Sequence, residues 1–225
     1  LPADPLPTMT LLLLPLLPLL AGVLLPLLPA GSPWVRRGAL SAALLQLACG
    51  FWLWRHPAAD LSISWLPRLG LTLDLGLDGL SLPLVLLAAL LTAMAVLAAP
   101  DHQIRPRLFF PLLLATNLGL IGSFLARNAL LFVLAYELIL IPTTLLVAIW
   151  GGERRAGAAV RFLIYGAVSG IALLAAVLAF GWLNPEGLNF SFTALANQSL
   201  TPSQQRWILA LVLLAFGLKL PVVPL

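Results

Sequence analysis

Long runs of apolar residues, separated by short polar segments, extend along the whole chain. Each run approaches the ~20 residues that a helix needs to cross the hydrocarbon core of a bilayer. We expect an α-helix in each run, because an open sheet would leave backbone groups unpaired in lipid. The pattern predicts about seven transmembrane helices, at residues 9–28, 38–54, 80–99, 109–126, 129–150, 158–183 and from 207 to the end.

Two polar connections between these runs have patterns of their own. In residues 60–78, leucines alternate with small or acidic residues, which predicts a short β-hairpin on the outer surface. Residues 184–205 form the longest polar connection, and its apolar residues predict a short interfacial helix. Those apolar residues are Phe190, Phe192, Leu195 and Leu200.

The composition indicates a membrane protein. Hydrophobic residues make up 61% of the 225 residues and charged residues 9%, whereas a soluble domain has about 25% charged residues. We therefore expect an all-α integral membrane protein in a lipid bilayer. The net charge of +4 does not indicate nucleic acid as a partner, because the basic residues lie in short loops and form no aromatic-interleaved basic face.

Residue types that hold cofactors are scarce in this sequence. Cys49 is its one cysteine, which excludes an internal disulfide and a cysteine-ligated cluster. His56 and His102 have no second ligand residue at a metal-binding spacing. A glycine-rich phosphate loop is also absent from the sequence. We expect this chain to hold no metal and no cofactor.

Arginines in the connections predict how the helices are oriented. The connections after the first, third and fifth runs carry Arg36, Arg37, Arg105, Arg107, Arg154 and Arg155. The other side carries Arg55, Arg68, Arg127 and Arg206. The excess favours the first set as cytoplasmic. The N-terminus is then expected on the outer or lumenal side.

Glu137 lies near the centre of the otherwise apolar run at residues 129–150. A charge at the centre of a membrane helix costs roughly 2.5–3.5 kcal/mol on insertion scales, so we interpret Glu137 as a functional carboxyl that faces protein or water. Pro142 lacks an N–H and frees the carbonyl of Leu138. Removal from water favours a neutral carboxyl, as suits a group that binds and releases protons. The alternative is a carboxyl locked to a basic group on another helix.

Lys219 repeats this arrangement near the end of the chain. It lies between Gly217 and two prolines, Pro221 and Pro224, which predicts an interrupted last helix of the kind that lines transport sites. The alternative is a lysine that extends to the membrane surface from a helix end. Arg161, near the start of the sixth run, is either a cytoplasmic anchor or a charge partner of Glu137, and the residues alone favour the anchor.

Asp78 comes just before the third run and is followed by Gly79 and Ser81. A carboxylate at this place accepts hydrogen bonds from the first backbone N–H groups of a helix. We therefore expect Asp78 to cap that helix.

Four blocks of the sequence resemble the antiporter-like subunits of complex I, in particular the type called subunit 4 or subunit M, in the form found in cyanobacteria and plastids. The blocks are LGLDGLSLPL at residues 75–84, LLFVLAYELILIP at 130–142, IWGG at 149–152 and FGLKLPVVPL at 216–225. Together, in this order and at this spacing, they are specific.

The resemblance implies roles for the three charged residues. Glu137 matches the family's essential glutamate and Lys219 its central lysine on a broken helix, while Arg161 lies where the family often has lysine. The implied function is redox-driven proton translocation, in which Glu137 controls Lys219 by charge. The implied partners are the other membrane subunits of an NAD(P)H–quinone oxidoreductase in a thylakoid or plasma membrane, where quinone is reduced on other subunits.

The sequence also departs from the family pattern. Tyr136 stands where the family usually has tryptophan, and the family continues with a histidine-containing block and about seven more helices. We therefore expect residues 1–225 to be the N-terminal part of an antiporter-like domain, with the input half of a proton path. Two alternatives stay open: a subunit of a multi-subunit cation/proton antiporter, and a truncated remnant that transports nothing.

Overall fold

The computed structural model describes residues 5–29, 32–66, 71–100, 104–185 and 187–220, and within them the chain is mostly helical. The helices are α1 (Pro5–Leu24), α2 (Trp34–Arg55), α3 (Ser81–Ala98), α4 (Pro106–Leu125), α5 (Ala129–Leu138), α6 (Leu140–Trp150), α7 (Arg155–Trp182), α8 (Phe192–Asn197) and α9 (Pro202–Gly217). A 3-10 turn (Leu25–Leu27) follows α1, and two strands, β1 (Leu61–Leu66) and β2 (Leu71–Leu75), separate α2 from α3.

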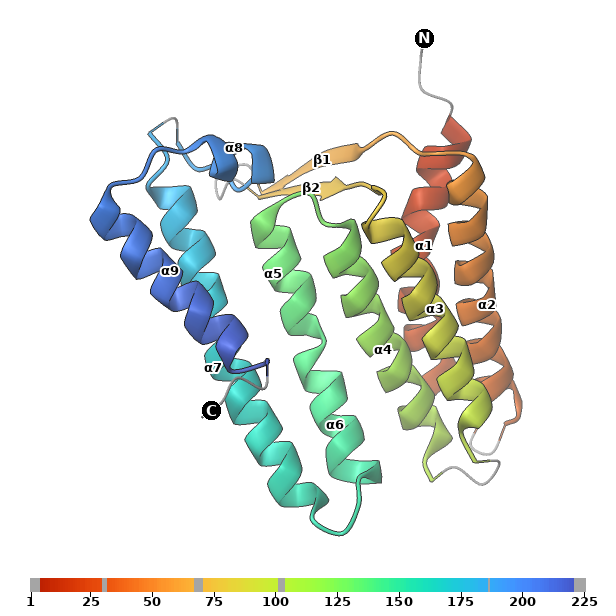
Figure 1. The fold of residues 1–225 in the computed structure, drawn as a ribbon. Coiled ribbons are helices and arrows are strands. Elements are labelled where there is room, and N and C mark those ends of the chain that lie inside the picture. Colours follow the sequence, from red (N-terminus) through yellow and green to blue (C-terminus); the bar gives the residue numbers. More distant parts are fainter. Residues whose placement is uncertain (1–4, 30–31, 67–70, 101–103, 186, 221–225) are drawn as a thin grey trace.

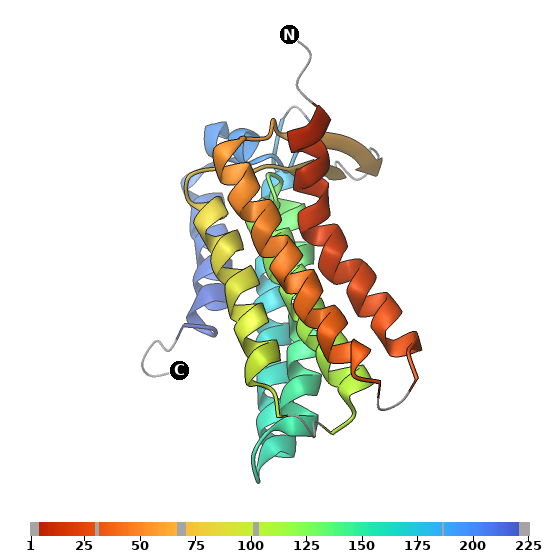
Figure 2. The same ribbon diagram turned by 90° about the vertical axis from the view of Figure 1, so that its right-hand side faces the viewer.

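The long helices run side by side as an elongated bundle (Figures 1 and 2). Helices α1 to α4 pack against one another, α4 then packs against α5 and α6, α7 covers α5 and α6, and α9 packs on α7. The hairpin and α8 lie at one end of the bundle, the same end as the start of α1 (Figure 1). The all-α architecture predicted from the sequence is confirmed.

Five segments are long and apolar enough to cross a membrane: Leu6–Leu27, Ser81–Ala98, Pro106–Leu125, Ala129–Trp150 and Arg155–Trp182. The predicted number of about seven spans is therefore not confirmed. Helix α2 is less apolar because it carries Arg36, Arg37 and Gln46, and α9 has 16 residues within the described part of the chain.

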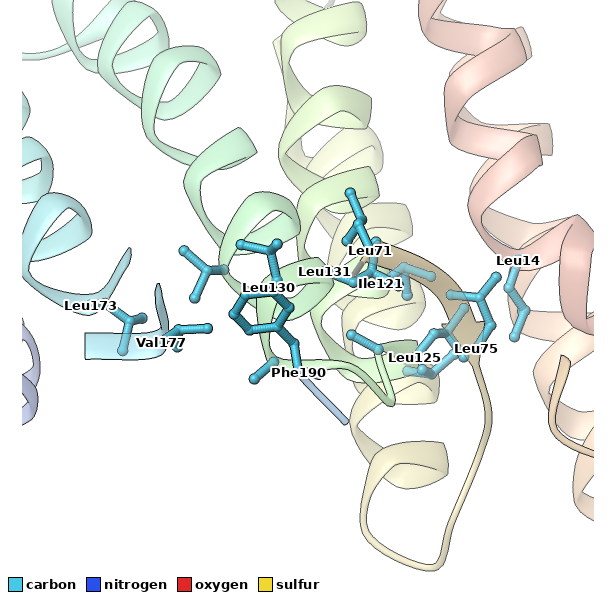
Figure 3. Close-up of a cluster of buried hydrophobic side chains, with 14 of the residues drawn as sticks. Leu14, Leu71, Leu75, Ile121, Leu125, Leu130, Leu131, Leu173, Val177 and Phe190 are labelled. Carbon is cyan, nitrogen blue, oxygen red and sulfur yellow. The ribbon is translucent and has the colours of Figure 1, made fainter. Parts of the chain in front are cut away.

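The predicted surface hairpin is present. Strands β1 and β2 pair antiparallel, with Leu61 opposite Leu75 and Ile63 opposite Leu73. Leu71 and Leu75 are buried, and they belong to the main core together with residues of α4, α5 and α7 (Figure 3). Alternation thus turns one leucine face of β2 toward the bundle.

Two residues between α4 and α5 attach the hairpin to the bundle. The backbone N–H of Arg127 donates to Asp74 O at 2.8 Å, and Arg127 Nη1 lies 2.9 Å from Asp78 Oδ2. The side chain of Asn128 caps α5, since its Oδ1 accepts from the N–H groups of Leu130 and Leu131. Its Nδ2 donates to Thr72 Oγ1 at 3.2 Å. The cap of α5 is therefore also a contact with the hairpin.

Asp78 has the predicted capping role, from a position before the helix. Its Oδ1 accepts from the N–H groups of Leu80 and Ser81 at 2.9 and 2.7 Å. The hydrogen bond from the Ser81 N–H, helped by that from Leu80 and by the charge of Arg127, lowers the pKa of Asp78 to about 2.

A proline in α1 explains a buried polar contact between three helices. Pro18 has no N–H, so the carbonyl of Leu14 lacks its helical donor. Gln46 Nε2 of α2 donates to this carbonyl at 2.6 Å, and Asn117 Nδ2 of α4 donates to Gln46 Oε1 at 2.7 Å. Gln46 and Asn117 are 0% and 1% exposed. The Gln46 amide thus replaces the backbone hydrogen bond that Pro18 cannot donate to Leu14 O.

The connection after α7 is also fixed to the bundle. Phe190 is 1% exposed and packs against Gly181 of α7, and its carbonyl accepts from Ala129 N–H at 2.8 Å. Figure 3 shows its ring beside Leu130 and Val177. The predicted short helix in this connection is α8, which begins two residues later, at Phe192.

Candidate functional site

The helix that carries Glu137 is interrupted directly after it. Helix α5 ends at Leu138 and α6 begins at Leu140, with Ile139 between them. At the junction Ile139 N–H donates to Tyr136 O, three residues back, and Pro142 has no N–H to donate to Leu138 O. The interruption expected from Pro142 is therefore present, and it separates two short helices rather than ending one.

The carboxyl of Glu137 lies directly against α7. A methyl group at Gly170 would overlap all three carboxyl atoms of Glu137, so the contact requires a glycine at that position. Glu137 Oε1 is buried, and no described residue donates a hydrogen bond to it. A buried oxygen without a donor is costly for an ionised carboxylate. The geometry therefore suits a group that also exists in the neutral form.

Glycines of two helices surround the α5–α6 junction. On α4, a methyl at Gly119 would meet Ile139 Cγ1 at 2.6 Å, and one at Gly122 would meet Ala135 Cβ at 3.0 Å. On α7, Gly166 packs against Leu140. Small residues let membrane helices approach closely. The interrupted helix is thus held between two glycine-lined surfaces.

Lys219 lies just beyond the end of α9. That helix ends at Gly217, and residues 218–220 form a turn, so α9 stops directly before Lys219. The part of the predicted interruption that follows Leu220, with Pro221 and Pro224, lies outside the described residues. In Figure 1 the end of α9 is level with the α5–α6 junction. The end of α9 and the α5–α6 junction therefore lie at a similar depth in the bundle.

The ammonium group of Lys219 lies over the ring of Tyr136, with Nζ 3.5 Å from the ring centroid. This distance is typical of a cation–π contact, and such a contact strengthens when water is removed. Tyr136 directly precedes Glu137 on α5. The ring therefore brings the lysine charge to the helix that carries the carboxyl.

Lys219 and Tyr136 line a pocket of about 490 Å³ between α4, α5, α6, α7 and the end of α9. Its other lining residues are mostly apolar or aromatic: Leu120, Ile139, Leu140, Phe162, Tyr165, Gly166 and Leu218. Lys219 itself is exposed in this chain, next to this lining.

Glu137 and Lys219 form no ion pair with each other. Among the described residues, the ion pairs are those of Arg127 with Asp60 and Asp78. An acid and a base that attract each other without contact can each exchange a proton with another group. Among the described residues, no basic group forms an ion pair with Glu137.

The structure does not bring Arg161 to this pair. Arg161 is exposed on α7, and its Nη2 lies 3.9 Å from the place of a methyl group at Gly157, one turn back on the same helix. The Glu137 carboxyl lies against Gly170, which is nine residues after Arg161 on α7. Nine residues correspond to about 13 Å along the helix axis. A direct charge contact between Arg161 and Glu137 is therefore absent from this arrangement of the described residues.

Sequence reasoning missed the residues of α7 that hold the site together. Gly166 and Gly170 are four residues apart, so they lie on one face of α7 and both contact the interrupted helix. This small-xxx-small spacing is a known signal for close packing of membrane helices, and it could have identified them. Ser169, on the same turn, donates from its Oγ to Ala215 O of α9 at 2.7 Å.

Comparisons with known proteins identify relatives of the family that the four sequence blocks resemble. Residues 126–225 match the family model described as "NADH:quinone oxidoreductase/Mrp antiporter, TM". The NAD(P)H-quinone oxidoreductase chain 4 of Prochlorococcus marinus (strain MIT 9515) is 50% identical over 164 residues, which are 73% of this chain and 30% of the relative. A chain 4 of a Picosynechococcus strain is 42% identical over 219 residues, covering 93% of this chain and 40% of the relative.

Solved structures also resemble this fold. A chain of respiratory complex I from Thermus thermophilus with bound NADH superposes with a TM-score of 0.82 and 31% identity, over 95% of this chain and 44% of that one. A chain of the Mrp complex from Dietzia sp. DQ12-45-1b gives a TM-score of 0.76 at 19% identity, over 95% of this chain and 23% of that one, which shows the shared fold alone. The resemblance inferred from the four sequence blocks is confirmed. The chain spans 30% and 40% of the length of the two curated relatives named above.

Proposed function

We propose that this chain, which over residues 126–225 matches the transmembrane family of NADH:quinone oxidoreductases and Mrp antiporters, is the N-terminal part of a proton-translocating membrane subunit of an NAD(P)H–quinone oxidoreductase. The relatives at 42% and 50% identity are chains of that enzyme. The observation that carries the proposal is the position of Lys219, whose Nζ lies over the ring of Tyr136, the residue directly before Glu137.

The proposed mechanism is control of one proton site by the charge of another. While Glu137 is ionised, its charge stabilises the ammonium form of Lys219. Protonation of Glu137 removes that stabilisation, and Lys219 then releases its proton more readily. The separation of the two groups supports this exchange, because an intimate ion pair would hold both in their charged forms.

The proposal includes where the chain works and with what. Six arginines lie near helix ends that are opposite the hairpin (Figure 1). They are Arg36, Arg37, Arg105, Arg107, Arg154 and Arg155. By the distribution of positive charge, the hairpin end and the N-terminus face the outer or lumenal side. The membrane is a thylakoid or plasma membrane, and the partners are the other membrane subunits of the complex. In this proposal, NAD(P)H and quinone react on other subunits and this chain holds no cofactor.

Substitution of Glu137 by glutamine tests the proposal. In the complete subunit, assembled in its complex, we expect Glu137→Gln to abolish proton uptake into membrane vesicles while leaving assembly intact. Glutamine keeps the shape but cannot bind a proton in place of the carboxylate. Glu153→Gln is the matched control, because Glu153 is exposed in the α6–α7 loop. Proton uptake at the normal ratio to electron transfer in Glu137→Gln would show that Glu137 is not essential.

Two substitutions of Lys219 separate a proton carrier from a fixed charge. We expect Lys219→Ala to lower proton uptake per electron and Lys219→Arg to restore only part of it, because arginine keeps the charge but does not release its proton. The measurement is proton uptake at matched rates of quinone reduction. Full activity of Lys219→Arg would mean that a fixed positive charge suffices.

The second candidate function is a subunit of a multi-subunit cation/proton antiporter. The family model covers both types, and the fold of the Mrp complex chain is similar. The high identity to chain 4 relatives favours the oxidoreductase. Proton movement that requires sodium and persists without quinone would favour the antiporter.

A further inference from the structure

We propose that Ser169 is a positioning residue that fixes the interrupted end of α9, and thereby the place of Lys219 relative to Glu137. This inference rests on the proposed proton-transfer function. The hydroxyl of Ser169 donates its hydrogen bond to neither charged group. Its effect passes through a backbone carbonyl of α9.

The end of α9 leaves one carbonyl without its regular donor. In a regular helix the N–H of Lys219 would donate to Ala215 O, four residues back. Here it donates to Phe216 O at 3.1 Å, and the N–H of Leu220 donates to the same oxygen at 2.8 Å. The carbonyl of Ala215 is therefore available to another group. An unpaired carbonyl is costly in a membrane interior, so the group that donates to it stabilises this end of α9.

Ser169 supplies that donor from the neighbouring helix. Its Oγ donates to Ala215 O at 2.7 Å, and both residues are 1% exposed. A hydroxyl inside a membrane helix commonly bonds to a carbonyl of its own helix, four residues back. Ser123 of this chain does so, donating to Gly119 O at 2.8 Å. Ser169 instead donates to another helix, at the point where that helix stops.

The residue after Ser169 is Gly170, which contacts the carboxyl of Glu137. Two consecutive residues of α7 thus hold the two halves of the site: Ser169 the helix end before Lys219, and Gly170 the carboxyl. Their fixed separation along α7 sets the distance over which the two charges act. Loss of the Ser169 hydroxyl leaves the end of α9 free to extend or shift, and Lys219 then moves relative to Glu137.

The test compares Ser169→Ala with Ser123→Ala in the complete subunit within its complex. Both substitutions remove a buried hydroxyl, but that of Ser123 bonds within α4. We expect Ser169→Ala to lower proton uptake per electron roughly three- to tenfold, the factor that one hydrogen bond commonly carries. We also expect the pH optimum of proton uptake to shift, because a displaced Lys219 experiences a different charge from Glu137. Ser123→Ala is expected to retain both properties.

Ser169→Thr guards against a folding defect, since it keeps the hydroxyl at the cost of one methyl group. We expect it to restore the wild-type pH optimum, even where its assembly is reduced. If Ser169→Ala keeps the normal ratio and pH optimum, or if Ser169→Thr behaves like Ser169→Ala, the positioning role is overturned. Normal proton uptake in Glu137→Gln would instead overturn the proposed function. The two failures are therefore distinguishable.

Discussion

At the scale of single residues, the site depends on small residues, which let helices approach closely, as much as on charged residues. Glu137 and Lys219 could be identified from the sequence, because a charge in an apolar run is costly enough to need a reason. Gly170 and Ser169 could not be assigned in the same way. Small residues are common in membrane helices, and their roles depend on which helix lies opposite. Only the packing of α7 between α5 and α9 shows these roles.

Gly170→Ala tests the contact of the carboxyl with α7. The added methyl would occupy the place of the Glu137 carboxyl, so the carboxyl has to move away from α7. We expect proton uptake in vesicles to fall on the order of 10- to 100-fold, as displacements of about 1 Å in a reactive site can cost that much.

Gly157→Ala is the matched control, on the same helix. The nearest atom to its methyl would be Arg161 Nη2 at 3.9 Å, an ordinary contact. Proton uptake should stay normal in this variant. Equal losses in the two variants would indicate a general effect of alanine in α7 and not a contact with Glu137.

At the scale of elements, prolines decide where helices are interrupted and where polar side chains are needed. The sequence predicted the interruption near Pro142, because proline chemistry is local. It did not predict that Pro18 leaves α1 continuous, or that Gln46 of α2 and Asn117 of α4 compensate for the missing bond. That compensation joins residues far apart in the chain, so no local pattern indicates it.

Gln46→Leu tests this link between α1, α2 and α4. The substitution leaves the Leu14 carbonyl and the Asn117 amide without their partner, and each such loss costs about 1–3 kcal/mol. We expect a lower thermal unfolding temperature of the detergent-solubilised protein, with Glu137 and Lys219 unaffected.

Ser41→Ala, on the same helix, is the control, since the exposed hydroxyl of Ser41 bonds to Gly38 O of its own helix. Its unfolding temperature should match that of the wild type. An unchanged unfolding temperature in Gln46→Leu would show that the buried link contributes nothing to stability.

At the scale of the whole molecule, the order of helices and the surface hairpin were predictable, because each follows from local periodicity. The attachment of the hairpin was not. The alternation of leucines with small or acidic residues identifies the strands. It does not show which loop of the bundle the strands contact. In the structure, Arg127 and Asn128 between α4 and α5 hold the hairpin, and Asp78 at the start of α3 binds Arg127. The surface layer thus connects three helices.

The pH dependence of stability tests this attachment. The pKa of Asp78 is lowered from 3.8 to about 2, so its stabilising contacts are fully present above about pH 4 and are lost as the pH falls toward 2. We expect Asp78→Asn to be less stable than the wild type at neutral pH, with a difference that shrinks below pH 4. The measurement is unfolding by denaturant at several pH values.

Glu153→Gln is a suitable control for a carboxylate on the opposite end of the bundle, and it should leave the unfolding curves unchanged. A difference between Asp78→Asn and the wild type that stays constant down to pH 2 would contradict the role of the ionised carboxylate.

The order of the site residues along the chain has a consequence for biogenesis. Glu137 is made 33 residues before Gly170 and 82 residues before Lys219. A helix inserted during synthesis therefore reaches the bilayer before Lys219 has been made. The span Ala129–Trp150 has a mean hydropathy of 2.3, and its many leucines and isoleucines each favour insertion. These residues offset the insertion cost of the carboxyl before α9 can complete the site.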